Sequence, residues 1–373
     1  MNILITGYNG FIGKNLIFSL KDIKKINILT FGRENKLADL ENLISKCSLI
    51  FHLAGENRND NDKNFTKNNI DLTTRIVEII NKKKKKTALI FSSTSQINKK
   101  NNIYSKTKFS AENILKKNSS SLFNVKIYRF TNIYGKWSKP NYNSVVATFC
   151  YNLSRNKKIK LSKINERLEL LYIDDVIDYF LSDIGIKFKK KFELIDSFNN
   201  TNKITLHNLA NKINFFKKNR SILLNNTELA DGFEKTLYST YLSYIPHDNF
   251  KYSINLINDS RGSFFEFLKS KKDGQVSILI VKSKKTRGNH FHMTKVEKFF
   301  ILSGQGTFLF ENIISGEKKT FSITANNRQI VESIPGWAHN IKNTGKNDLI
   351  VILWSNEIFN KAKPDTFHYN LDR

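Results

Sequence analysis

The chain has 373 residues, of which 40% are hydrophobic and 12% are aromatic. This composition excludes an intrinsically disordered protein, and the length leaves room for two domains, each with its own core. Lysine and arginine number 61 against 33 aspartate and glutamate residues, so the formal net charge is +28.

The distribution of this charge argues against a nucleic-acid partner. Most cations are lysines spread along the whole chain, whereas arginine is the residue suited to bidentate phosphate and base contacts. No apolar run approaches the ~18 residues of a membrane helix. No cleavable leader precedes the first strand, and two cysteines, Cys47 and Cys150, form no disulfide framework. We expect a cytoplasmic protein without nucleic-acid or membrane partners, whose basic field favours small polyanions.

Strand-like and helical patterns alternate over the first 245 residues. Apolar runs predict strands over residues 2–6, 26–31, 49–53, 88–92 and 125–130. Helical periodicity separates them, for instance over residues 69–81 and 106–117. This alternation predicts an α/β fold, a doubly wound parallel sheet of the Rossmann type, with ligands at the carboxyl ends of its strands.

A glycine-rich loop joins the first strand to the first helix. Gly7 permits a tight turn, Gly10 lets the backbone approach a pyrophosphate, and Gly13 lets the helix pack closely on the strand. The helix N-terminus supplies N–H groups and a positive partial charge. The alternative is a glycine-rich turn that binds nothing. The other residues expected to contact a dinucleotide are Asn9, Phe11, Ile12, Leu53, Ala54 and Gly55.

The end of the second strand bears on the choice of dinucleotide. An acidic residue there usually holds the ribose 2′-hydroxyl of NAD, whereas an arginine accommodates the 2′-phosphate of NADP. Arg33 therefore favours NADPH, although Glu34 is its immediate neighbour.

The catalytic pattern is a tyrosine followed four residues later by a lysine. Tyr104 and Lys108 share one face of a helix, where the ammonium is expected to lower the phenol's pKa for proton exchange with an alcohol or ketone. Ser93 and Thr94 end the fourth strand in hydroxyl groups that could bind the same oxygen. A surface helix carrying an incidental tyrosine is the alternative.

The pattern changes around Pro246. Short β-rich runs recur over residues 276–282, 298–303, 307–311, 328–333 and 349–354, separated by glycine, asparagine and aspartate. Such runs predict an all-β jelly-roll barrel. We therefore place the domains at residues 1–245 and 246–373.

A candidate metal site lies within this second domain. His290 and His292 are two apart on an expected strand and point to one face. Glu297 and His339 could complete a three-nitrogen, one-oxygen set for zinc, manganese, iron or nickel. The alternative is a metal-free pocket in which a histidine acts as a base.

The first 245 residues resemble the extended short-chain dehydrogenase/reductase (SDR) family that acts on nucleotide sugars. The resemblance rests on the glycine loop, the Tyr104–Lys108 pattern and the segments at residues 129–135 and 171–176. It implies that Thr94 is the catalytic hydroxyl, with Ser93 the less favoured choice. The family's 4,6-dehydratases have Asp-Glu after this threonine, whereas Ser95 and Gln96 stand here, which argues against dehydration.

The second domain resembles the cupin fold, through its His-x-His, Glu297 and the Pro-Gly-x-x-His-x-x-x-Asn stretch ending at Asn343. The two modules together resemble the CapF-type family of bifunctional UDP-sugar C3-epimerase/C4-reductases of capsular polysaccharide biosynthesis. This resemblance also covers the segments at residues 135–144 and 238–244.

The family resemblance implies a two-step reaction on a UDP-2-acetamido-2,6-dideoxy-4-hexulose. The cupin would epimerise C3 with His290 or His292 as base, and the SDR domain would then reduce C4 with NADPH to UDP-2-acetamido-2,6-dideoxy-L-talose, in the UDP-L-FucNAc pathway. It also implies a divalent metal, zinc by preference, and a homodimer. The expected substrate contacts are Asn57, Arg58, Asn132, Asn141, Asn143 and Ser144.

Three alternatives remain at this point. One is a plain NADPH-dependent 4-ketoreductase with a structural cupin, and another is a 4-epimerase that recycles tightly held NAD. The third is a non-catalytic dinucleotide sensor that binds nucleic acid, for which steep salt dependence and no turnover are expected.

Overall fold

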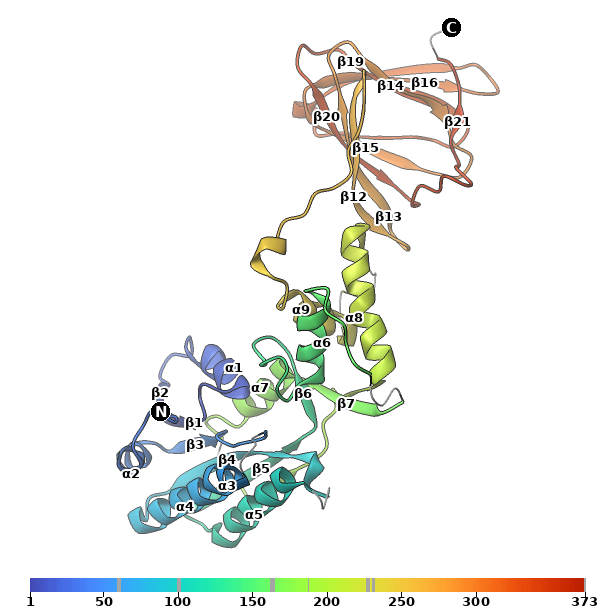
Figure 1. The fold of residues 1–373 in the computed structure, drawn as a ribbon. Helices are drawn as coiled ribbons and strands as arrows, with labels where there is room; N and C mark the ends of the chain where they lie inside the picture. The colour runs from blue at the N-terminus through green and yellow to red at the C-terminus, as the bar shows by residue number, and fades with distance from the viewer. Residues whose placement is uncertain are drawn as a thin grey trace. The chain divides into compact units, whose positions relative to one another are not determined.

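The computed structural model describes residues 1–58, 62–98, 102–161, 165–186, 188–225, 229 and 232–371 (Figure 1). The chain divides into two compact units: Met1–Asn214 with Thr236–Pro246, and Phe215–Lys235 with His247–Arg373. Segment 215–235 precedes the boundary expected at residue 245 but belongs to the second unit. There β10 (Leu224–Asn225) pairs with β12 (Gly262–Ser270).

The first unit contains a six-stranded parallel sheet in the order β2-β1-β3-β4-β5-β8. Its strands are β1 (Asn2–Thr6), β2 (Asn27–Phe31), β3 (Leu49–His52), β4 (Thr87–Thr94), β5 (Phe123–Phe130) and β8 (Phe192–Ile195). Burial on both faces explains why the central strands read as continuous apolar runs. The expected doubly wound sheet is confirmed.

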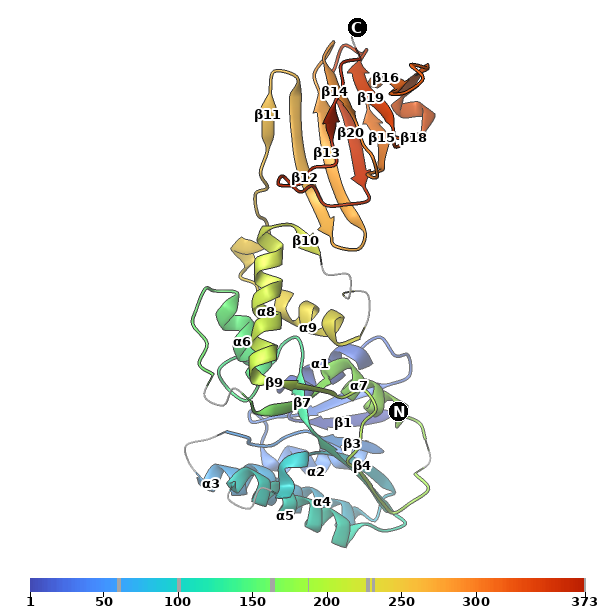
Figure 2. The same cartoon turned by 90° about the vertical axis from the view of Figure 1, so that its right-hand side faces the viewer.

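Helices cover both faces of this sheet (Figures 1 and 2). On one face α2 (Leu37–Lys46), α4 (Leu72–Lys83) and α5 (Ile103–Asn118) bury an apolar core, and on the other α1 (Phe11–Leu20) and α7 (Ile173–Ser182) do so. Chain order reverses at β1, which lies between β2 and β3. The loops after these strands therefore meet at one carboxyl edge, where such sheets bind ligands.

Two element boundaries place the predicted catalytic residues. β4 continues beyond the run expected at 88–92, so that Ser93 and Thr94 still belong to the strand. α5 begins before the expected residue 106, because the Asn102 side chain caps it by accepting a hydrogen bond of 3.0 Å from the Tyr104 N–H. Tyr104 therefore lies in the first turn of α5, next to the end of β4.

The rest of the first unit adds a small sheet and further helices. The sheet has the order β6-β7-β9, with β6 (Asn132–Tyr134), β7 (Arg167–Tyr172) and β9 (Asn202–Thr205). The other elements are the one-turn α3 (Asp62–Phe65), a π-helical turn η1 (Thr66–Asp71), a short turn η2 (Ser95–Asn98) and α6 (Val145–Leu153). Two more helices, α8 (Leu206–Ser221) and α9 (Gly232–Leu242), are each divided between the two units.

The second unit is built from two sheets (Figure 2), which are antiparallel except for the short parallel pair β10–β12. Their buried side chains form an apolar core. One sheet runs β10-β12-β13-β20-β15-β18, with β11 paired to β12, and the other runs β17-β16-β19-β14-β21. The bounds are β11 (Ile257–Asp259), β13 (Gly274–Val281), β14 (Thr286–Phe291), β15 (Glu297–Ser303), β16 (Gln305–Asn312), β17 (Lys318–Thr324), β18 (Ile330–Glu332), β19 (Trp337–Asn343), β20 (Leu349–Ser355) and β21 (Phe367–His368), with short turns η4 (His247–Asn249) and η5 (Ala325–Asn327). This confirms the cupin-type barrel.

Two strands matter most for the site, β14 and β19. A strand was expected at His290 and His292, but β14 ends at Phe291, so His292 directly follows it. β19 was not among the strands expected from β-rich runs. A bulge interrupts their pairing: Gly288 lies opposite Asn340, but His290 lies opposite His339, so Asn289 is an extra residue with φ of 61°. Buried Asn343 ends β19, where its side-chain amide donates to the carbonyl of Val281 at 2.7 Å.

None of the helices in the described part of the chain has the length and apolarity needed to cross a membrane.

Candidate active sites

The glycine loop has the geometry of a dinucleotide cradle. Gly7 has φ of +68°, and a Cβ there would lie 2.6 Å from the Ala54 backbone. A Cβ on Gly13 would lie 2.5 Å from the Gly7 carbonyl oxygen, so side chains are excluded at both positions. No side chain of the described residues caps α1, which begins after Gly10. Its first N–H groups can therefore bind a pyrophosphate.

Other loop residues expected to contact the dinucleotide lie at the same edge of the sheet. Leu53, Ala54 and Gly55 follow β3, and the Ala54 N–H donates to the Thr6 hydroxyl at 3.2 Å. Asn9 is exposed, and Phe11 and Ile12 open α1 as half-buried residues. These residues therefore lie at the carboxyl ends of β1 and β3, which are adjacent strands.

Arg33 and Glu34, which follow β2, have different partners. The Glu34 carboxylate accepts a hydrogen bond from the Tyr8 phenol, which lowers the pKa of Glu34. Glu34 also lies against Gly32, where a Cβ would approach its Oε1 to 2.5 Å. The Arg33 guanidinium instead forms an ion pair of 2.7 Å with Glu56, a residue to which the sequence pattern assigned no role.

The structure brings Thr94 and Tyr104 into contact. Thr94 is buried at the end of β4, and its hydroxyl hydrogen-bonds the phenol of Tyr104. Burial raises the pKa of Tyr104 to about 12, and the hydrogen bond from Thr94 only partly counteracts this. The phenol therefore stays protonated across the physiological range and can act as a proton donor. Ser93, the less favoured hydroxyl, is also buried.

Lys108 lies one helical turn beyond Tyr104 and is buried beneath the same edge. Its ammonium donates to the Ser92 carbonyl at 2.9 Å and lies 4.4 Å from the centre of the Phe91 ring. A Cβ on Gly55 would approach Lys108 Nζ to 3.1 Å. The shared helix face is confirmed, but the expected lowering of the Tyr104 pKa is wrong for this structure. Burial of the phenol is the largest influence on its pKa, and the Lys108 ammonium bonds to the strand instead.

The buried Lys108 predicts a pH dependence of the reaction. Burial lowers its pKa to about 8, while Glu112 opposes that shift. The cationic form exists below this pKa, so its charge is lost as the pH rises through about 8. We expect kcat/KM for NADPH oxidation with a 4-keto sugar nucleotide to fall above about pH 8. A Lys108→Met variant should show a lower rate without this limb, and an unchanged limb in the variant would contradict the assignment.

Predicted substrate residues divide into two groups. Asn57 and Arg58 follow β3, and the Arg58 guanidinium donates to the carbonyl of Tyr142 at 2.7 Å, so this loop contacts the segment that carries Asn141 and Asn143. In the part of the chain that the structure describes, no donor reaches the buried Oδ1 of Asn57. That oxygen is therefore a candidate for a ligand contact.

Ser144 and Asn132 have structural partners. The Ser144 hydroxyl caps α6 by accepting from the Ala147 N–H at 3.3 Å. The exposed Asn132 donates to the Glu169 carbonyl at 3.1 Å. A substrate role for Asn132 and Ser144 therefore stays a prediction.

Asn69 is a buried residue that the sequence pattern did not reveal. Its side chain exchanges hydrogen bonds with the Glu56 backbone, at 2.8 and 3.0 Å, and donates to the Thr107 hydroxyl at 3.0 Å. It lies in the π-helical turn η1, a rare conformation that is frequent at functional sites. Asn69 thereby fixes the loop after β3 against α5 at Thr107, between the predicted catalytic residues Tyr104 and Lys108.

In the second unit, the four predicted metal ligands meet inside the barrel. One ligand atom from each of His290, His292, Glu297 and His339 lies within 4.8 Å of the others. The Nε2 atoms of His292 and His339 each lie 3.3 Å from the same Glu297 oxygen. His292, Glu297 and His339 are buried, whereas His290 is half-buried. Three imidazoles and one carboxylate are a donor set that a divalent metal such as zinc accepts.

The electrostatics of the cluster fit a cation. Burial by itself raises the pKa of the Glu297 carboxyl, but the approach of His292, His339 and the Lys295 ammonium holds it well below its usual range. The Lys295 Nζ lies 3.0 Å from Glu297. Burial, followed by His339, lowers the pKa of His290 to about 3, so its imidazole is neutral near pH 7. Within the described residues, the buried Nε2 atoms of His292 and His339 make no hydrogen bond with proper geometry. Buried imidazole nitrogens that converge on one carboxylate oxygen form a donor set suited to a metal ion.

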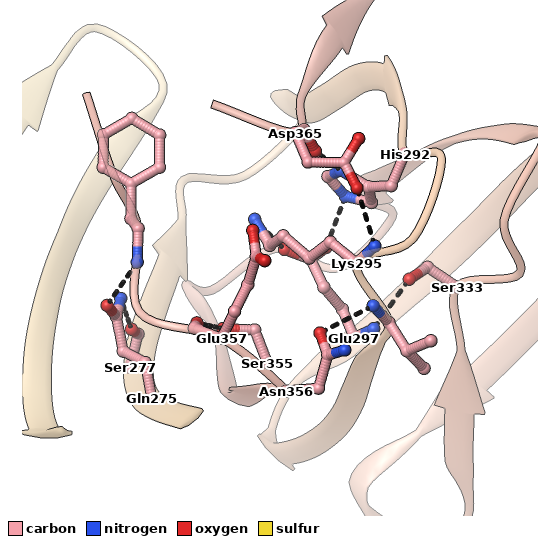
Figure 3. Close-up of polar contacts among 12 residues, drawn as sticks. Gln275, Ser277, His292, Lys295, Glu297, Ser333, Ser355, Asn356, Glu357 and Asp365 are labelled. Atoms are coloured by element: carbon pink, nitrogen blue, oxygen red, sulfur yellow. Dashed lines mark hydrogen bonds and ion pairs between the residues drawn. The ribbon is translucent and has the colours of Figure 1, made fainter. Parts of the chain in front are cut away.

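Asp365 supports this cluster from a distant part of the chain (Figure 3). Its backbone carbonyl accepts from His292 Nδ1 at 2.5 Å, and its carboxylate accepts from the N–H groups of Met293, Thr294 and Lys295. The four interactions fix the loop between β14 and Glu297. They also leave His292 Nε2 as the nitrogen that faces the cluster.

The bulge at Asn289 adds Arg287 to this interior. Arg287 lies opposite Ile341 and His290 opposite His339, and both partners face the core side of β19. Arg287 and His290 therefore point the same way, although three positions separate them. The Arg287 guanidinium pairs with Asp259 at 2.9 Å. Asp259 also binds Arg261, and that hydrogen bond lowers the Asp259 pKa to about 2.

The geometry defines a two-part protein: an SDR-type dinucleotide-binding unit and a cupin-type barrel with a histidine–glutamate cluster. Residues 3–182 match the NAD dependent epimerase/dehydratase family, and residues 257–367 match the polysaccharide biosynthesis C-terminal domain. A curated relative, UDP-2-acetamido-2,6-beta-L-arabino-hexul-4-ose reductase of Pseudomonas aeruginosa, is 36% identical over 368 residues, covering 98% of each chain. The chain belongs to the family of that reductase.

Solved structures agree with this assignment. The crystal structure of the capsular polysaccharide assembling protein CapF from Staphylococcus aureus is 36% identical, with a TM-score of 0.88 and all of both chains covered. A second CapF structure, with the inhibitor 3-isopropenyl-tropolone, has 34% identity and a TM-score of 0.85. MoeE5 in complex with UDP-glucose and NAD has a TM-score of 0.51 at 15% identity over 57% of this chain, and shows the fold alone.

Proposed function

We propose that the protein is a bifunctional nucleotide-sugar enzyme. The cupin would epimerise C3 of a UDP-2-acetamido-2,6-dideoxy-4-hexulose, and the first unit would then reduce the C4 ketone to UDP-2-acetamido-2,6-dideoxy-L-talose for a surface polysaccharide. The observation that carries this proposal is the Thr94–Tyr104–Lys108 cluster at the glycine-loop edge. It occurs in one chain with the four-residue cluster of the barrel. The family resemblance adds a cytoplasmic homodimer to the proposal.

The residues of the first unit suit the reduction step. When bound, NADPH supplies the hydride for C4. Thr94 holds the ketone oxygen, and Tyr104, whose pKa is raised to about 12, donates its proton to the alkoxide that forms. Lys108 places a positive charge under the same edge, where it attracts the dinucleotide. Arg33, at the end of β2, is the residue that would meet a 2′-phosphate.

The residues of the barrel suit proton abstraction next to a ketone. The C3–H of a 4-keto sugar is acidified by the carbonyl, so a neutral imidazole can remove it, and reprotonation on the opposite face inverts C3. His290 is the better base of the two candidates because it is half-buried, whereas His292 is buried and fixed by Asp365. His292, Glu297 and His339 would hold zinc. His290 would be a fourth ligand only when it is not acting as the base, because a metal-bound imidazole nitrogen has no free electron pair. A bound zinc ion would polarise a carbonyl or stabilise the barrel.

Deuterium exchange tests this function directly. The purified protein is incubated in D2O with a UDP-2-acetamido-2,6-dideoxy-4-hexulose, first without NADPH, and followed by NMR. We expect deuterium at C3 and, once NADPH is added, its oxidation together with a new alcohol at C4. No exchange but normal NADPH oxidation would reduce the protein to a ketoreductase with a structural cupin. Neither reaction would mean that the substrate class is wrong.

A further inference from the structure

Glu56 is a buried carboxylate that the proposed reaction does not use. It lies in the loop after β3, and only 3% of its surface is exposed. A buried charge is unfavourable unless it is paired and hydrogen-bonded. Glu56 meets this requirement with three side chains that come from different parts of the first unit.

The three partners lie close to the carboxylate. Arg33 Nη2 lies 2.7 Å from Oε2, Asn68 Nδ2 donates to Oε2 at 3.3 Å, and the Tyr142 hydroxyl donates to Oε1 at 3.1 Å. Of these, only Arg33 carries a charge. Asn68 and Tyr142 together keep the carboxylate oriented independently of the guanidinium.

The strand order places the Arg33–Glu56 pair next to the expected dinucleotide site. β1 lies between β2 and β3, so an ion pair from the end of β2 to the loop after β3 crosses the carboxyl end of β1. The glycine loop begins at that end. In folds of this type the adenosine ribose lies at the end of the second strand, next to the residue at position 33. The pair therefore involves the arginine at the position where a 2′-phosphate is bound in such folds.

The two members of the pair differ in freedom to move. The Arg33 side chain is 81% exposed, whereas that of Glu56 is 4% exposed. The guanidinium can turn from the carboxylate to a phosphate, but Glu56 is fixed through its backbone by Asn69. Any anion that binds Arg33 must compete with an anion that stays in place.

We propose that Glu56 is a specificity-determining residue that competes with the 2′-phosphate of NADPH for Arg33. This inference rests on the proposed function, since it concerns the dinucleotide used by the reductase. NADPH must draw the guanidinium away from Glu56. NADH carries a neutral hydroxyl and leaves the pair in place. Glu56 thus lowers the preference for NADPH that Arg33 provides.

The test is a Glu56→Gln variant, which keeps the shape and the Tyr142 hydrogen bond but removes the charge. Dissociation constants for NADPH and NADH are measured by nicotinamide fluorescence, without any sugar nucleotide. We expect the Kd for NADPH to fall about fivefold, the size typical of an ion pair with an exposed partner. The Kd for NADH should change less than twofold.

Two controls isolate the charge. Asn68→Ala removes a neutral contact to the same carboxylate oxygen and should leave the NADPH-to-NADH ratio of Kd values unchanged. In an Arg33→Met background the effect of Glu56→Gln should disappear, because the two residues act through one contact. Glu56→Ser serves as a second variant if the amide prevents folding, which a thermal unfolding curve reports.

Other results would overturn the inference. Equal tightening of NADPH and NADH would mean that the pair hinders both dinucleotides. Weaker NADPH binding in the variant would mean that Glu56 supports the site. If the wild-type protein binds neither dinucleotide, the proposed reductase function itself fails, and this is seen before any variant is compared.

Discussion

A Tyr104→Phe substitution should lower kcat for NADPH-dependent reduction by about a thousandfold, within the range reported for loss of a positioned general acid. The phenol is buried next to Thr94, and its high pKa keeps the proton on the oxygen. Phenylalanine fills the same space, so the fold and the α5 cap should survive. The measurement is the loss of NADPH absorbance under substrate saturation. Dinucleotide binding should change little, because the substitution leaves the glycine loop intact.

The same variant separates the two active sites. The barrel residues are untouched, so C3 deuterium exchange in D2O should proceed at the wild-type rate. Thr107→Ser is a matched control on the same helix: Thr107 accepts from Asn69 through its hydroxyl, which serine retains. Loss of exchange in Tyr104→Phe, or reduction within tenfold of the wild type, would contradict the proposed division of labour.

Substitution of His290 by glutamine should lower the C3 exchange rate by about a hundredfold or more, because no other half-buried imidazole of the described cluster can take the proton. NADPH oxidation should then fall as well, since the reductase would no longer receive the epimerised ketone. NMR in D2O measures the first effect and absorbance the second. The thermal unfolding curve of the variant should match that of the wild type, which checks that the barrel remains folded.

Mixing the two inactive variants provides a sharper result. Tyr104→Phe keeps the barrel site and His290→Gln keeps the reductase site. If the epimerised ketone diffuses between molecules, the mixture should oxidise NADPH although neither variant does so alone. Failure of the mixture, with both proteins folded, would contradict a sequential reaction through a free intermediate.

The sequence predicted the fold class well because the information was local. Alternating apolar strands and amphipathic helices are visible within windows of a few residues, and the sheet of the first unit follows from them. β14 has no apolar alternation in its sequence, Thr-Arg-Gly-Asn-His-Phe, and was expected only from the spacing of His290 and His292. It is a strand because β19 and β21 pair with it on both sides. Such long-range pairing is invisible in the segment itself.

The same contrast between local and long-range information applies to the candidate sites. Tyr104, Lys108 and the glycines were found from their spacing, and His290, His292 and Glu297 lie within a short stretch. Glu56 and Asp365 were missed because their partners lie 23 and 73 residues away along the chain. The sign of the Tyr104 pKa shift was also wrong, since spacing reports which groups are near and says nothing of how deeply they are buried.

The extra residue at Asn289 has an evolutionary consequence. Because side chains alternate along a strand, loss of this one codon would keep the reading frame and every neighbouring residue, yet would turn Arg287 to the outer face while His290 stayed inside. A single substitution in β14 changes one side chain. A single insertion or deletion turns to the opposite face every side chain of the strand that lies on one side of the change. Among related genes whose products are functional, the length of this strand should therefore vary less than the identity of its residues.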